Sequence, residues 1–145
     1  MLIHRIAAQL YTAGALQDID VALTAGEDAT LAISQSGRTL AVAAQFARRP
    51  RPTVYIVSGE DAADRAARTI AAYAGADRVA RFSERKDYPW KNQEPDDAVV
   101  ATRCSALARI AQGDSCIMVA SARSLLRCVP PLGVAHVFGG RRGRV

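Results

Sequence analysis

Residues 32–39 have the residue types and the spacing of a phosphate-binding turn. They read Ala-Ile-Ser-Gln-Ser-Gly-Arg-Thr and align with the phosphate-binding loop G-x-x-x-x-G-K-[ST]. Gly37 and Thr39 match this pattern, whereas Ala32 replaces the first glycine and Arg38 replaces the lysine. The candidate site is therefore a degenerate phosphate loop that consists of Ala32, Ser34, Gln35, Ser36, Gly37, Arg38 and Thr39.

The two mismatches argue against nucleotide hydrolysis. The glycines of such a loop let backbone N–H groups wrap around phosphates, and its lysine reaches the β- and γ-phosphates as a compact charge. Arg38 is longer and planar, so it is not equivalent to that lysine. Residues 58–61 and 120–123 follow later predicted strands, and neither segment resembles an acidic Mg²⁺-binding box. We expect a vestigial loop and no enzymatic activity in this chain, with Arg38 at most an anion contact.

Other catalytic constellations are not recognisable in the sequence. His4 and His136 lie at opposite ends of the chain, without a spaced ligand set, so we expect no metal site and no cofactor. The cysteines lack Cys-x-x-Cys spacing and lie among apolar residues, where cysteine behaves as a small hydrophobe; they are Cys104, Cys116 and Cys128. Tyr88 and Trp90 form an aromatic cluster in a polar loop, which either anchors the loop to its own domain or contacts a partner.

Strands and helices alternate in the pattern of the chain. The predicted strands are 29–34, 53–57, 78–82 and 116–120. The predicted helices lie within the first 26 residues and at 38–48, 58–73, 96–112 and 121–126. Ser58 and Ser121 are the expected N-caps of two helices. This order predicts an α/β fold with a parallel sheet covered by helices on both faces, and ligands bind at the carboxyl ends of such strands.

Composition indicates one ordinary globular domain. The chain has 145 residues, of which 50% are hydrophobic and 23% charged, and its net charge is +5. Without the three arginines of the last five residues, 16 basic residues face 14 acidic ones. No apolar run approaches the roughly 20 residues that span a bilayer, so we expect a cytoplasmic protein without membrane contact. The expected segments are a helical segment 1–28 that packs on the domain, the α/β subdomain 29–131, and 132–145, a basic tail or the start of a missing subdomain.

An ordered series of motifs resembles one protein family. Residues 31–131 resemble the first subdomain of the UvrB-like N-terminal module in bacterial transcription-repair coupling factors, the Mfd family. The similarity includes the small-residue turn 34–40, the strand 53–57 and the block 117–131, which is the closest match. Further positions agree with the order and spacing of the family's motifs; they are Phe82, Pro89, Trp90, Pro95, Arg103, Leu107, Ile110 and Gly113. UvrB itself has an intact Gly-Lys-Thr loop and a long Tyr-rich hairpin, both of which this chain lacks.

The resemblance implies a RecA-like, three-layer helicase fold with a degenerate phosphate loop. It also implies a non-catalytic interaction scaffold in transcription-coupled nucleotide excision repair. In such proteins the module helps to recruit UvrA, mainly through the following subdomain, and it packs on other domains to restrain the DNA translocase. ATP hydrolysis and contacts with RNA polymerase and DNA belong to other parts of the parent protein. Candidate interaction residues here are Tyr88, Trp90, Arg103 and Arg123.

Two alternatives remain open from the sequence. In the first, the chain is a P-loop NTPase or helicase half that still binds nucleotide. In the second, it is a stand-alone small α/β nucleotide-binding module. The resemblance also implies that the chain corresponds to one subdomain of a larger protein, and this makes a separate prediction. If a neighbouring subdomain normally covers part of this domain, the isolated chain exposes an apolar patch and self-associates.

Overall fold

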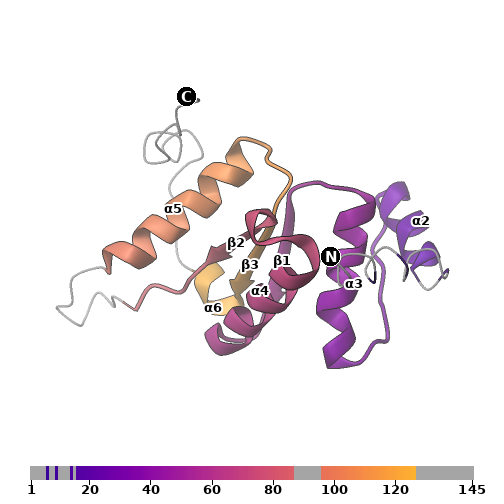
Figure 1. The fold of residues 1–145 in the computed structure, drawn as a ribbon, viewed down its shortest axis with the longest axis horizontal. Helices are drawn as coiled ribbons and strands as arrows, with labels where there is room; N and C mark the ends of the chain where they lie inside the picture. The colour runs from indigo at the N-terminus through magenta and orange to yellow at the C-terminus, as the bar shows by residue number, and fades with distance from the viewer. Residues whose placement is uncertain (1–5, 7–8, 10–13, 15, 87–95, 127–145) are drawn as a thin grey trace.

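The computed structural model describes residues 6, 9, 14, 16–86 and 96–126 (Figure 1). Its helices are α2 (Gln17–Ala25), α3 (Gln35–Arg48), α4 (Glu60–Ala74), α5 (Asp97–Ala111) and α6 (Ala122–Leu125), with a 3₁₀ turn at Ala76–Arg78. The strands are β1 (Thr53–Val57), β2 (Val79–Phe82) and β3 (Ile117–Ser121). They form a three-stranded, all-parallel sheet in the order β1-β3-β2, so β1 and β2 are both edge strands.

Helices cover both faces of this sheet. Successive residues of a strand point to opposite faces, so Ile117 and Val119 of β3 face one way and Met118 and Ala120 the other. The first pair packs against α4 together with Phe46 of α3. The second pair packs in a core whose other buried members are Ala80, Phe82 and Ala106, the last of these in α5. The predicted α/β fold with a parallel sheet covered on both faces is therefore confirmed.

Helix α3 occupies an outer position. It lies between α2 and α4 and packs mainly against α4 (Figure 1). A third buried cluster, formed by Leu16, Ala43 and Ala44, joins it to the start of α2. On α3, Phe46 is buried and Ala47 is exposed. The buried residues of α3 thus pack mainly on another helix and less on the sheet.

The predicted strand at 29–34 is wrong. Residues 27–34 have no regular secondary structure, and Leu31 and Ala32 are exposed. Only Ile33 is partly buried, against the start of α3. A short apolar run has no periodicity that distinguishes a strand from an irregular segment beside a helix. The sheet consequently has three strands in the described residues, and its β1 edge has no neighbour there.

Most of the other element boundaries agree with the sequence. Gly75 ends α4 and Gly26 ends α2, and Gly26 has a left-handed φ of 77°. The Asp96 carboxylate caps α5 by accepting from the Ala98 N–H at 2.9 Å, and the Ser121 hydroxyl caps α6 by accepting from the Ser124 N–H at 3.1 Å. The described helices include none that combines the length and the apolar composition needed to cross a bilayer.

Candidate functional site

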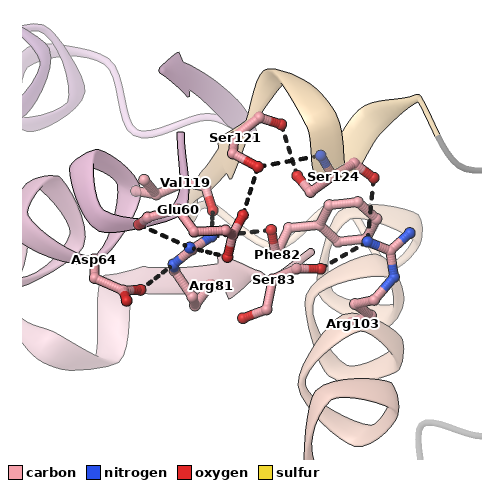
Figure 2. Close-up of polar contacts among 9 residues, drawn as sticks. All are labelled: Glu60, Asp64, Arg81, Phe82, Ser83, Arg103, Val119, Ser121 and Ser124. Atoms are coloured by element: carbon pink, nitrogen blue, oxygen red, sulfur yellow. Dashed lines mark hydrogen bonds and ion pairs between the residues drawn. The ribbon is translucent and has the colours of Figure 1, made fainter. Parts of the chain in front are cut away.

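The carboxyl ends of β2 and β3 meet the start of α4 in a polar network (Figure 2). Glu60 is the first residue of α4, and its Oε1 accepts a hydrogen bond of 2.5 Å from the Ser121 hydroxyl. Its Oε2 lies 2.6 Å from the Arg81 guanidinium, which also contacts Asp64 at 2.8 Å. Arg81 in addition donates to the Val119 carbonyl at 3.2 Å. One carboxylate therefore joins β2, β3 and α4.

The Glu60 carboxylate is engaged by neighbouring side chains and is not available to a substrate or a metal ion. The sequence pattern places it at the helix start, with Ser58 as the expected N-cap. In the structure Gly59 holds the N-cap position without a side-chain bond, and the Glu60 side chain turns inward, 23% exposed. Both of its oxygens have partners, and charge-assisted hydrogen bonds of this kind are strong. The carboxyl ends of β2 and β3 are thus joined to α4 through this carboxylate.

A second network surrounds Arg103 of α5. Its guanidinium donates to the carbonyl oxygens of Ser83 at 2.7 Å and Ser124 at 3.1 Å, and it lies 3.8 Å from the centroid of the Phe82 ring (Figure 2). Arg103 is only 6% exposed. Its assignment to an interaction surface is therefore corrected, since the side chain is committed to the interior. Helical spacing relates Arg103 to the buried Ala106, which is the one sequence signal of its position.

The predicted phosphate loop adopts a helical conformation over most of its length. Residues 35–39 form the first turn of α3, and the Gly37 N–H donates to the Ser34 carbonyl at 3.0 Å. A Cβ atom on Gly37 would lie 2.8 Å from the Ile33 side chain, so close packing explains this glycine. Ala32 lies apart, exposed in the irregular segment. The backbone therefore does not form a loop that wraps a phosphate.

Four of the loop residues nevertheless line one groove. The α3–α4 groove has a volume of about 700 Å³ and lies between the first turn of α3, the carboxyl end of β1 and one side of α4. The loop residues that line it are Gln35, Ser36, Arg38 and Thr39. The groove brings them together with Ser58, which follows β1, and with Arg65 of α4. Arg65 was not identified from the sequence, because nothing local relates a mid-helix arginine to a turn 27 positions earlier.

The remaining predicted residues lie apart from this groove or outside the described residues. Arg123 is exposed on α6, whereas Tyr88 and Trp90, with His4, His136 and Cys128, lie outside the described residues. Burial raises the pKa of the Cys116 thiol, and the nearby Arg109 only partly offsets this. A raised pKa makes the nucleophilic thiolate scarce at neutral pH. Residues 16–86 and 96–126 contain no group of three side chains placed to hold a metal ion.

Comparisons with protein-family models, with curated proteins and with solved structures find no match to this chain. Its chemistry must therefore be inferred from the groove, the two polar networks and the exposed surface.

Proposed function

We propose that this chain is a non-catalytic interaction scaffold. Its role is the one that the sequence resemblance implies, the degenerate helicase-like first subdomain of a UvrB-like module. Such a module helps to recruit UvrA to stalled transcription and restrains a DNA translocase whose active site lies elsewhere in the parent protein. The observation that carries the proposal is the edge of the sheet at β1, where no other strand of the described residues pairs and two apolar side chains are exposed.

Strand β1 presents apolar side chains to solvent. Val54 is 46% exposed and Ile56 is 54% exposed, and both lie in the edge strand β1. Their neighbours Tyr55 and Val57 pack on the α4 side, so Val54 and Ile56 face the opposite side. There the buried cluster to which α5 contributes contains residues of β2 and β3 and none of β1. Exposed apolar side chains on an edge strand are typical of a surface that another subunit or domain covers.

The helical conformation of most of the predicted phosphate loop supports a non-catalytic role. Of the residues that would wrap a nucleoside triphosphate, 35–39 form the first turn of α3 and Ala32 lies apart from it. The acidic residue nearest the strand ends, Glu60, is bound to Ser121 and Arg81. A scaffold tolerates both features, whereas hydrolysis of ATP requires a phosphate cradle and an acidic ligand for Mg²⁺.

We expect the isolated chain to self-associate through the exposed Val54 and Ile56 of β1. We expect wild-type protein to form dimers or larger species as its concentration rises, in sedimentation velocity. Val54→Thr/Ile56→Thr should weaken this association by about tenfold or more, because threonine keeps the β-branched shape and removes apolar area.

Val21→Thr is the matched control. Val21 is 69% exposed on α2 and is not part of the sheet, so its replacement should leave self-association unchanged. A wild-type chain that stays strictly monomeric at high concentration would contradict the proposal. Equal effects of the control and of the edge variant would also contradict it, because the association would then not depend on β1.

A further inference from the structure

The α3–α4 groove carries positive charge and no negative charge. Of the residues that line it, only Arg38 and Arg65 are charged. We propose that this groove binds a nucleotide unit, with its phosphate on the two guanidinium groups and its base against a tyrosine. This activity goes beyond a scaffold role and does not depend on it. The nucleotide unit is either free or part of a single strand, because both sources offer the same phosphate and base.

Several other arginines of the described residues are paired with carboxylates. Arg49 pairs with Asp20 at 3.1 Å, and Arg81 lies between two carboxylates. Within the described ranges, neither Arg38 nor Arg65 has a side-chain hydrogen bond or an ion pair. Two unneutralised guanidinium groups on one concave surface attract an anion, and their planar donor forks fit phosphate oxygens in a bidentate manner.

The rest of the groove suits a nucleotide. Ser58 and Thr69 line it, with the Thr69 hydroxyl donating to the Arg65 carbonyl oxygen at 2.9 Å, and the half-buried side chains of Tyr55 and Tyr73 contribute aromatic surface. Its volume of about 700 Å³ is within the usual range for small-molecule sites. The groove also lies at the carboxyl end of β1, where open α/β sheets bind their ligands. Stacking of a base on an aromatic ring tolerates any base, so we expect little sequence preference.

The proposed site supports binding without hydrolysis. The groove lining includes no aspartate or glutamate, and so no carboxylate ligand for the Mg²⁺ ion that phosphoryl transfer uses. The phosphate would lie between two helices, on the side chains of Arg38 and Arg65, and not within the backbone of residues 32–37. This position distinguishes the site from a phosphate loop that wraps the triphosphate.

The test is binding of a fluorescein-labelled oligothymidylate of eight nucleotides, measured by anisotropy at low salt. Arg38→Ala and Arg65→Ala should each weaken binding about tenfold, as expected for a charged hydrogen bond to phosphate. The slope of log K against log salt should fall by about 0.7 for each single-strand phosphate that a variant no longer neutralises. Arg65→Lys keeps the charge but loses the planar fork, so it should have an intermediate effect.

Arg68→Ala is the matched control. Arg68 is an exposed arginine of the same helix, three residues from Arg65, and it does not line the groove. Its replacement should change binding less than about twofold, since diffuse surface charge contributes little at one position. Circular dichroism of each variant verifies that the fold is retained.

Competition with AMP and with inorganic phosphate identifies the source of the nucleotide unit. Displacement of the oligonucleotide by AMP, with the same dependence on Arg38 and Arg65, supports a free nucleotide. Binding of the oligonucleotide alone, with that dependence, supports a strand. The proposal is overturned if the wild type binds neither probe, or if Arg68→Ala weakens binding as much as the groove variants do.

Discussion

Replacement of Arg103 by alanine should lower the free energy of unfolding by about 3–4 kcal/mol. Three losses combine in this variant. The carbonyl oxygens of Ser83 and Ser124 lose a donor in the interior, the Phe82 ring loses the guanidinium that lies 3.8 Å from its centroid, and a cavity remains. Equilibrium unfolding in urea, followed by circular dichroism, measures the change.

Two further variants make this prediction specific. Arg103→Lys keeps a positive charge but loses the planar group that bridges two carbonyl oxygens, so it should cost about half as much. Arg123→Ala removes an exposed arginine from α6 and should change stability by less than about 0.5 kcal/mol. If Arg103→Ala were no more destabilising than Arg123→Ala, the buried position of Arg103 would be refuted.

Replacement of Glu60 by alanine should be the next most destabilising change, at about 2–3 kcal/mol. The Arg81 side chain is only 15% exposed, and it would keep Asp64 as a carboxylate partner, whose side chain is 53% exposed. The fully buried Ser121 hydroxyl would lose the acceptor of its hydrogen bond. Glu60→Gln keeps an acceptor for Ser121 but removes the charge, so it should cost less than Glu60→Ala.

A double-mutant cycle between Glu60→Ala and Ser121→Ala tests the contact directly. We expect a coupling energy of about 1 kcal/mol, since the two side chains share one short hydrogen bond. Asp61→Ala is the control, because Asp61 is exposed in the same helical turn and should cost less than about 1 kcal/mol. A coupling energy near zero would contradict the contact between α4 and β3.

The regular elements were largely predictable because local patterns determine them. The β-branched run 53–57, the Asp96 cap and the terminating Gly75 each act within a few residues of the chain. The strand predicted at 29–34 failed for the same reason. Its apolar residues fit a strand locally, but nothing in a six-residue window specifies whether a neighbouring strand is available.

The polar networks were not predictable, because they depend on residues that are distant in sequence. Glu60 and Ser121 are 61 positions apart, and Arg103 reaches Ser83 and Ser124 from about 20 positions away in each direction. A local pattern places such charged residues at the surface, since arginine and glutamate are rarely buried without partners. The sequence indicated one side of the α3–α4 groove, the turn 35–39, but it did not indicate Arg65 on the other side.

ATP turnover in the presence of Mg²⁺ tests the central claim, a non-catalytic scaffold, most directly. We predict no hydrolysis above background by the wild type, nor by Ala32→Gly/Arg38→Lys, which restores the two mismatched positions of the phosphate loop. Two substitutions should not create a cradle, because Gly37 lies within α3 and Ala32 lies apart from the groove. Turnover by the wild type that Thr39→Ala abolishes would contradict the non-catalytic role and identify an active NTPase.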